Sequence, residues 1–461
     1  MNFEHLKQRY GGKLLRRQEI PLDDPSFQQL LLQKQFTPIP SIQRKHFRHQ
    51  CMRCNERKRL AMIPCQICQN THLYCRNCVE MGRVMECEPL YYWSGEPANW
   101  PKHADPCSWK GELTPAQQKA ANRIVQAIAN SEDELLIWAV CGAGKTEMLF
   151  PGISEALRRG MRLCIATPRA DVVRELLPRL KSAFTEIPIQ GLYGGSEEKD
   201  ATAQFILATT HQLLRFKEAF DVIVIDEVDA FPFHKDRSLP FAANRSKKSK
   251  AVTIYLTATP RADLQKKIER KQLPCVFVPV RFHGKPLPVP DKKMDFFLKK
   301  HLRHFSPPDS FMRWLKQRKN PKRQLLIFVP TIQLAEKMKR KLVSIFLKEN
   351  FISAESELES VHADDPDRTD KVNLFREKKL RILMTTTILE RGVTFPSVDI
   401  AVLDAGHDVF DEAALVQISG RAGRSPDDPT GEVVFFHDGK TEAMEQAISS
   451  IQKMNRRAGF S

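Results

Sequence analysis

The sequence of 461 residues lacks any apolar run that approaches the roughly 20 residues needed to span a bilayer. Its first residues, Met-Asn-Phe-Glu-His-Leu-Lys, also lack the apolar core of a secretory signal peptide. These absences predict an intracellular, soluble protein and leave a peripheral place on a membrane open. Glycine and proline, at 20 and 30 residues, are not enriched enough to indicate disorder, and 42% hydrophobic residues predict a globular chain.

Acidic residues are too few to balance the basic ones. The chain has 55 Asp and Glu against 72 Lys and Arg, which gives a formal charge of +17. This balance favours a polyanionic partner, with nucleic acid ahead of an anionic membrane face. A soluble basic surface is the plainer alternative. The length suggests about three structural units.

Six of the 11 cysteines form three C-x-x-C pairs within residues 51–78. In a reducing cytosol such clustering favours a metal over disulfides, and two all-cysteine pairs close a structural Zn²⁺ site. The predicted ligands are Cys51, Cys54, Cys75 and Cys78, because their separation fits a ribbon with an inserted loop. The alternative uses Cys65 and Cys68 with either outer pair. A redox role is less expected, since no βαβ pattern surrounds the pairs.

The segments on either side of the cysteine pairs are less informative. Residues 1–40 are predicted only to be a packing or docking extension. Basic residues in the module, Arg53 among them, could form a surface that contacts DNA and whose shape depends on zinc. The simplest role of the zinc ion is to stabilise the fold of this short segment. Aromatic residues in 81–112 could stack on unpaired bases, but packing of the zinc module onto the next domain is favoured. They are Tyr91, Tyr92, Trp93, Trp100 and Trp109.

A small, glycine-containing turn follows the apolar run at 134–140. It reads Gly142-Ala143-Gly144-Lys145-Thr146 and leads into a helical pattern. Small residues let backbone N–H groups approach phosphates, and the helix directs the positive end of its dipole at them. We predict that Lys145 reaches the β- and γ-phosphates of ATP and that the Thr146 hydroxyl holds Mg²⁺. Ala139 stands in place of the usual first glycine, and a turn that binds nothing is the plainer alternative.

Apolar, β-branched runs separated by helical patterns continue through residues 113–285 and predict a parallel sheet buried on both faces. The runs are 134–140, 162–166, 205–208, 221–225 and 252–256. Before them, Thr114 and Pro115 are predicted to begin a helix. Gln117 in its first turn would read an adenine edge or would serve only to cap the helix.

Polar residues at the ends of such strands are where ligands bind. Asp226 at one strand tip can hold Mg²⁺ through water, and Glu227 can orient and deprotonate the attacking water. An acidic pair that caps a helix is the alternative. Because Lys145 and Thr146 lie upstream on the same predicted sheet, ATP hydrolysis is favoured.

Residues 286–461 repeat the alternation of apolar runs and helices but have no phosphate loop of their own. Runs at 324–329, 380–384, 398–403 and 432–436 predict a second α/β sheet. Arg421 and Arg424, three residues apart, are predicted to project from one helix face. Such a pair suits an arginine finger supplied to the γ-phosphate held by the first lobe.

The ordered motifs resemble those of superfamily 2 helicases. They are residues 142–146, 167–169, 226–229, 257–259, 387–392 and 417–424. The resemblance covers about residues 113–440 and implies two RecA-like lobes with ATP in the cleft and a nucleic-acid strand across both. It implies that Gln417, Arg421 and Arg424 close the ATP site, and that Thr257 and Thr259 link hydrolysis to lobe movement. Gln417 stands where DEAD-box RNA helicases carry His, which argues against that group.

The whole chain is similar to the ComFA family of late competence ATPases of transformable Gram-positive bacteria. The similarity rests on the C-x-x-C module and on residues 74–84, 135–152 and 385–394. It implies use of ATP to draw transforming single-stranded DNA into the cytoplasm. It also implies a place at the inner face of the membrane, beside the uptake channel and other competence proteins.

We therefore expect an α/β ATPase that translocates single-stranded DNA, with ATP, Mg²⁺ and Zn²⁺ as cofactors and no other stable small-molecule substrate. The predicted divisions are an N-terminal extension with the zinc module at 1–112 and RecA-like lobes at 113–285 and 286–461. The predicted location is cytoplasmic or peripheral on the inner face of the cell membrane. Two alternatives are a replication-restart or recombination helicase resembling PriA, and a non-catalytic DNA-binding adaptor.

Overall fold

The chain folds into two compact units in a computed structural model that describes residues 3–45, 48–198, 200–390 and 395–460. The first unit comprises Met1–Ile137 and Thr146–Phe277, and the second comprises Trp138–Lys145 and Val278–Ser461. The division into 1–112, 113–285 and 286–461 stays a prediction. Across the described ranges, no helix combines the length and the apolar character required to cross a bilayer.

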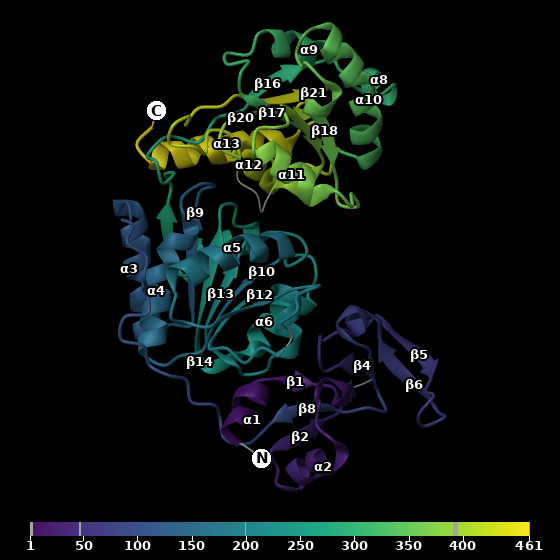
Figure 1. The fold of residues 1–461 in the computed structure, drawn as a ribbon, viewed down its shortest axis with the longest axis vertical. Helices are drawn as coiled ribbons and strands as arrows, with labels where there is room; N and C mark the ends of the chain where they lie inside the picture. Colours follow the sequence, from purple (N-terminus) through teal and green to yellow (C-terminus); the bar gives the residue numbers. More distant parts are fainter. Residues whose placement is uncertain (1–2, 46–47, 199, 391–394, 461) are drawn as a thin grey trace. The chain divides into compact units, whose positions relative to one another are not determined.

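The larger sheet has seven strands, and Figure 1 draws it in blue and teal among its helices. In sheet order they are β11 (Ile189–Leu192), β12 (Phe205–Thr209), β10 (Leu163–Thr167), β13 (Phe220–Asp226), β14 (Lys247–Thr257), β9 (Glu134–Ala139) and β15 (Cys275–Val278). The pairs from β11 to β14 are parallel, and every residue of β10 and β12 is buried. The five predicted apolar runs are therefore all strands. The two strands missed by the prediction, β11 and β15, form the edges of the sheet, where short strands carry a weaker apolar signal.

Helices cover the larger sheet as the alternating pattern predicts. They are α3 (Pro115–Ala129), α4 (Lys145–Arg158), α5 (Ala170–Ala183), α6 (Ser238–Ser246) and α7 (Ala262–Glu269), with the short helix η3 (Thr210–Arg215). The predicted start of α3 is confirmed, because Thr114 is its N-cap and Pro115 its first residue. Helix α5 packs on β10, β11 and β12, whereas α3 packs on β14.

The second unit contains a six-stranded sheet in which every neighbouring pair is parallel. In order the strands are β16 (Asp291–Met294), β21 (Val433–His437), β20 (Val398–Leu403), β17 (Gln324–Phe328), β19 (Ile382–Thr385) and β18 (Leu358–Val361). The helices are α8 (Leu298–Arg303), α9 (Asp309–Lys316), α10 (Ile332–Lys348), α11 (Arg368–Arg376), α12 (Glu412–Ser419) and α13 (Glu442–Arg457), with η4 (Glu355–Glu357) and η5 (Thr387–Glu390). The four runs predicted here are all strands, so the predicted second α/β sheet is confirmed.

The N-terminal extension has a small core of its own. Its elements are α1 (Phe3–Tyr10), η1 (Arg17–Glu19), α2 (Asp24–Leu32) and a sheet of β1 (Leu14–Leu15), β8 (Leu90–Trp93) and β2 (Phe36–Ile39). Trp93 packs edge-on against Phe36 with 5.2 Å between ring centroids, and Trp109 packs against Phe150 at 5.4 Å. The guanidinium of the buried Arg162 lies 4.7 Å from the ring centroid of Trp100. Trp100 and Trp109 therefore pack onto the next domain, as the favoured interpretation predicts, whereas Trp93 packs within the extension.

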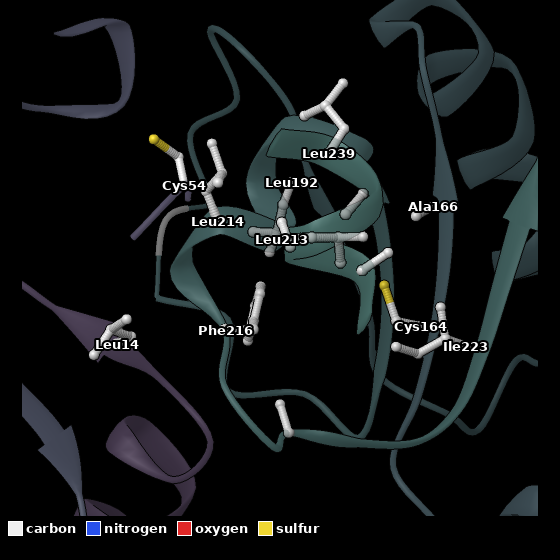
Figure 2. Packing of buried hydrophobic residues seen from close by; sticks show 14 of the residues in the cluster. Leu14, Cys54, Cys164, Ala166, Leu192, Leu213, Leu214, Phe216, Ile223 and Leu239 are labelled. Atoms are coloured by element: carbon white, nitrogen blue, oxygen red, sulfur yellow. The ribbon is translucent and has the colours of Figure 1, made fainter. Parts of the chain in front are cut away.

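The cysteine module consists of short antiparallel strands. Strands β3 (Ile42–Lys45) and β4 (Arg48–Cys51) form one sheet, and β5 (Leu60–Pro64), β6 (Thr71–Cys75) and β7 (Val84–Met85) form another. The short helix η2 (Arg76–Met81) lies between β6 and β7. Cys54 shares one buried cluster with Leu213 and Leu214 of η3 and with Phe216, and Figure 2 labels these side chains within that cluster. The predicted class, two parallel-sheet α/β lobes preceded by a small cysteine module, is confirmed.

Candidate active site and candidate metal centre

The predicted phosphate loop joins a buried strand to a helix. Strand β9 ends at Ala139, and α4 begins at Lys145, so Lys145 and Thr146 lie in the first turn of the helix. Gly142 and Gly144 have φ of 79° and 71°, a backbone region in which side chains are strained. Glycine therefore allows a turn tight enough to direct backbone N–H groups at an anion, next to the positive end of a helix dipole.

The predicted acidic pair lies at the tip of β13. Asp226 is the last residue of the strand, and its Oδ1 accepts the backbone N–H of Glu227 at 2.9 Å. Both residues are half-buried. Glu227 has φ of 53°, a conformation that costs a non-glycine residue about 1–3 kcal/mol. Strain held in an acidic residue at a strand tip is typical of functional sites.

Asp229, to which the sequence analysis gave no role, connects two of the motifs. Its Oδ1 accepts the Thr257 hydroxyl at 2.5 Å, and its Oδ2 accepts the Thr259 hydroxyl at 2.7 Å. The Thr259 backbone N–H also donates to Thr257 Oγ1 at 2.9 Å. Asp229 is 1% exposed, so this network is shielded from water. The signal was present in the second acidic residue of Asp226-Glu227-Val228-Asp229 and in the two threonines around Ala258.

Gln117 is occupied at least in part by capping of α3. Its Oε1 accepts the backbone N–H of Thr114 at 2.7 Å, and its own N–H donates to Thr114 Oγ1 at 3.4 Å. Together these bonds form a capping box. The capping alternative therefore describes the Oε1 atom, while recognition of adenine stays a prediction.

Arg421 and Arg424 do not project from a helix face, so that expectation is wrong. Helix α12 ends at Ser419, and Gly420 is its C-cap. Gly420 and Gly423 follow in close succession, and Gly423 has φ of 61°, which a helix cannot accommodate. Arg424 Nε instead donates to the Gly420 carbonyl at 2.9 Å. The arginines lie in the turn after the helix, and Arg421 is buried there.

Gln417 lies near the turn of the phosphate loop, whose residues Trp138–Lys145 belong to the second unit. Cys141 Sγ is 3.0 Å from Gln417 Oε1 and donates to it. A Cβ on Gly420 would clash with the Cys141 side chain, so glycine is required for this approach. Within the second unit the structure thus brings one predicted site residue, Gln417, against the loop that contains Gly142.

Arg281 is a candidate that the sequence analysis missed. Its Nη1 donates to the Gly423 carbonyl at 2.5 Å, and the N–H of the next residue, Phe282, donates to the Gly142 carbonyl at 2.9 Å. Burial, helped by the nearby charge of Arg424, lowers the pKa of Arg281 to about 10. Its segment belongs to no motif, so only the tertiary contacts reveal it. Motif residues Arg391, Gly392, Val393 and Thr394 lie outside the described residues.

The predicted zinc ligands Cys51, Cys54, Cys75 and Cys78 come together; we name them the first cysteine cluster. Their Sγ atoms lie within 4.8 Å of one another, with Cys51 and Cys78 at 3.9 Å and Cys54 and Cys75 at 3.5 Å. Four sulfurs around Zn²⁺ at about 2.3 Å would be about 3.8 Å apart. The geometry and the all-thiol donor set fit Zn²⁺, although zinc binding itself stays a prediction.

Arg53, between the cysteines of the first pair, does not contribute to a basic surface as expected. It is completely buried, and its Nη1 donates to the Met81 carbonyl at 3.0 Å while its Nη2 donates to Glu19 Oε1 at 3.2 Å. Arg245 reaches the same place, with Nη2 2.7 Å from the Leu214 carbonyl and Nη1 3.2 Å from that of Met52. The buried Arg53 and the half-buried Arg245 therefore fasten the first cysteine pair onto η3.

A groove lies between the cysteine module and residues 231–238, which follow β13; we name it the basic groove. Its cationic lining residues are Arg48, Arg57, Lys58, Arg59, Lys235 and Arg237. They outnumber the acidic lining residues Glu56, Glu80 and Asp236. His211, which follows β12, and Phe231, which is 68% exposed, also line it. The groove thus combines positive charge with an accessible aromatic ring.

Comparison with known proteins identifies the family. The family model described as "Competence protein ComFA N-terminal domain" matches residues 1–92. The competence protein ComFA of Bacillus subtilis (strain 168) is 43% identical over 456 residues, which is 99% of this chain and 96% of that protein. The chain belongs to the ComFA family. The ComFA protein of Streptococcus pneumoniae (strain ATCC BAA-255 / R6) is 39% identical, covering 88% of this chain and 93% of its own length.

Further matches cover the parts of this ComFA family member that contain the two large sheets. "Type III restriction enzyme, res subunit" matches residues 110–262, and "Helicase conserved C-terminal domain" matches 308–426. The helicase Lhr of Mycobacterium smegmatis, bound to single-stranded DNA and AMP-PNP, has a TM-score of 0.53 at 17% identity, covering 78% of this chain and 51% of Lhr. The DEAD-box helicase Mss116, bound to single-stranded RNA and UDP-BeF, has a TM-score of 0.52 at 18% identity, covering 76% and 83%. These similarities show the helicase-type fold.

Proposed function

We propose that this ComFA family member hydrolyses ATP to move along single-stranded DNA and thereby serves the uptake of transforming DNA. The observation that carries the proposal is the loop between β9 and α4, where left-handed Gly142 and Gly144 precede Lys145 and Thr146 at a helix N-terminus. Backbone and side-chain donors in that order suit the phosphates of a nucleotide. Membership of the family and the two helicase domains support the same conclusion.

The proposed roles in the first half of the ATP site follow from the chemistry of each side chain. Lys145 would bind the β- and γ-phosphates, and Thr146 and Asp226 would hold Mg²⁺, directly or through water. Bound Mg²⁺ would neutralise charge on the phosphate oxygens. Glu227 would orient the attacking water and accept its proton. Backbone N–H groups of residues 142–144 would contact the phosphates.

The second half of the proposed site lies around the turn after α12. Arg421 and Arg424 would contact the γ-phosphate and stabilise charge that develops in the transition state. Gln417 would contact the nucleotide from the last turn of α12, and Gln117 would read the adenine edge with atoms that capping leaves available. The hydrogen bonds that the Thr257 and Thr259 hydroxyls donate to Asp229 support a link between the tip of β13 and the end of β14. Such a link would couple the loss of the γ-phosphate to movement of the lobes.

The proposed path for DNA includes the basic groove. Lysine and arginine side chains would contact phosphates along the strand. These electrostatic contacts make binding weaker as the salt concentration rises. Phe231 would stack on a base, an interaction that tolerates any sequence. A DNA substrate also agrees with the name "competence protein" that members of the family carry. Partners would be other competence proteins and a membrane DNA-uptake channel, reached from the cytoplasm or the inner face of the membrane.

The deciding experiment is ATP turnover by the full chain, titrated separately with single-stranded DNA, duplex DNA and RNA. We expect the largest stimulation with single-stranded DNA, because unpaired bases are open to stacking and the groove binds phosphates without reading sequence. A rate indifferent to every nucleic acid would contradict translocation. Absence of any phosphate release would favour a non-catalytic adaptor, and efficient strand displacement on forked DNA would favour a PriA-like helicase.

A further inference from the structure

A second C-x-x-C turn in the cysteine module has the same backbone structure as the first. In the first turn, the Cys51 N–H donates to the Glu56 carbonyl and the Asn55 N–H donates to the Cys51 carbonyl, both at 2.9 Å. In the second, the Cys65 N–H donates to the Asn70 carbonyl at 2.8 Å and the Gln69 N–H donates to the Cys65 carbonyl at 3.0 Å. The residue after each pair is left-handed, with φ of 66° at Asn55 and 59° at Gln69. The equivalent turn therefore presents Cys65 and Cys68 as two ligands from one knuckle.

A third thiol completes what we name the second cysteine cluster: Cys65, Cys68 and Cys87. Cys87 follows β7, and the preceding Glu86 N–H donates to the Leu73 carbonyl at 2.9 Å, which holds this segment beside β6. The three Sγ atoms lie within 4.8 Å of one another, and those of Cys65 and Cys87 are 3.8 Å apart. That separation is about the one expected for two sulfurs on a tetrahedral Zn²⁺.

His72 is the candidate for the fourth ligand, because it lies against Cys68. Its Nε2 is 3.1 Å from Cys68 Sγ, and its Nδ1 is 4.0 Å from Glu86 Oε2. A carboxylate that accepts the outer ring N–H orients histidine ligands in zinc sites, and Glu86 lies next to that nitrogen but beyond hydrogen-bond distance. Glu86 Oε2 is itself held by the Leu73 backbone N–H at 3.1 Å.

The two clusters lie at opposite ends of one hairpin. The register of β5 and β6 pairs Leu60 with Cys75 at one end and Pro64 with Thr71 at the other. The four residue steps between them span roughly 14 Å, so one ion cannot serve both clusters. The structure therefore groups Cys65 and Cys68 with neither outer pair, in contrast to the alternative raised by the sequence.

The hairpin end near Cys65 has little apolar core to stabilise it. No residue of β5 is buried, and β6 buries only Cys75. Ile67, inside the second pair, is 89% exposed, and Met62 is 60% exposed. Short segments of this kind depend on a metal for the stability that burial does not supply. We propose that Cys65, Cys68, Cys87 and His72 form a second, structural Zn²⁺ site, in addition to the one predicted at the first cysteine cluster.

The test is metal content of the full-length chain, purified without added chelator and measured by elemental mass spectrometry. We expect two zinc ions per chain, and one ion after the double substitution Cys65→Ser, Cys68→Ser. The matched control, Cys107→Ser, alters a cysteine outside both clusters and should retain two ions. One zinc ion in the natural chain, or no loss on the double substitution, would overturn the proposal.

A second measurement needs no substitution that could impair folding. Thiol-reactive mercurial added to the natural chain should release zinc in two equal phases, detected with a colorimetric chelator. The first should come from the second cluster, where Cys68 and Cys87 are exposed, and the slower one from the first, where all four thiols are buried. His72→Ala should accelerate only the faster phase. Release of zinc in a single phase that His72→Ala leaves unchanged would contradict the site, whatever the outcome for ATP turnover.

Discussion

Thr257 Oγ1 donates a 2.5 Å hydrogen bond to Oδ1 of Asp229, a carboxylate that is 1% exposed. Thr259 binds the other oxygen of the same carboxylate at 2.7 Å. Asp229 follows the tip of β13, and the threonines lie at the end of β14, so one buried anion connects two adjacent strand ends. Asp226, the proposed Mg²⁺ ligand, lies at the tip of the first of these strands.

The substitution Asp229→Asn should weaken this connection without a change in side-chain size. An amide offers one acceptor oxygen where the carboxylate offers two, so at least one hydroxyl loses its charged partner. We expect the free energy of unfolding of the first unit to fall by about 1.5–3 kcal/mol. Stimulation of ATP turnover by DNA should fall more than the basal rate. Urea unfolding and turnover assays check both effects, with the exposed Asp263→Asn as the control. Unchanged stability would contradict the role assigned to Asp229.

The substitution Lys145→Ala should abolish ATP hydrolysis while DNA binding largely survives. Loss of a charged donor to the phosphates is expected to reduce turnover by at least about 100-fold. Phosphate release and single-stranded DNA binding are measured on the same preparation. Lys119→Ala, an exposed position on α3, should leave both unchanged. Normal turnover by the Lys145 variant would refute the assignment of the phosphate loop.

Removal of Arg53 should loosen the first cysteine pair from the first unit. Arg53→Ala removes a buried guanidinium, and the carbonyl of Met81 loses this donor while Glu19 keeps Arg16 and Arg215 as partners. Loss of a partner for a buried polar group costs about 1–3 kcal/mol. Thermal unfolding should therefore shift down by several degrees. Arg57→Ala, at an exposed position in the same turn, should change stability by no more than about 0.5 kcal/mol. Equal effects of the two substitutions would argue against the docking role.

Neutralisation of the basic groove should lower affinity for single-stranded DNA and its dependence on salt. The triple substitution Lys58→Gln, Lys235→Gln, Arg237→Gln removes three exposed charges. If all three contact phosphates, the slope of log affinity against log salt should decrease by about 2. Fluorescence anisotropy at several salt concentrations measures it. The control neutralises Lys119, Lys181 and Lys266, which are exposed elsewhere in the first unit. An identical slope for both triple variants would exclude the groove from the DNA path.

Local pattern was sufficient for the α/β architecture. Each run of β-branched residues predicted inside the two lobes is a buried strand, because a parallel strand covered on both faces requires continuous apolar side chains. The phosphate loop was equally readable, since glycine at positions 142 and 144 is a direct consequence of a backbone that few other residues adopt. The first cysteine cluster could be selected from spacing alone, although the second could not.

Tertiary structure decided whatever depends on residues distant in the sequence. Cys87 joins Cys65 and Cys68 only because β7 returns beside β6, and Asp229 meets Thr257 only because β13 and β14 are neighbours. Arg53 counts toward the basic charge of the module, yet its side chain is buried, and the charge count alone does not show this. The sequence by itself determined the central buried strands and the residues that suit phosphate and zinc, because both follow from local backbone and side-chain chemistry. Only the folded chain decided which of those side chains meet, because contact depends on strand order.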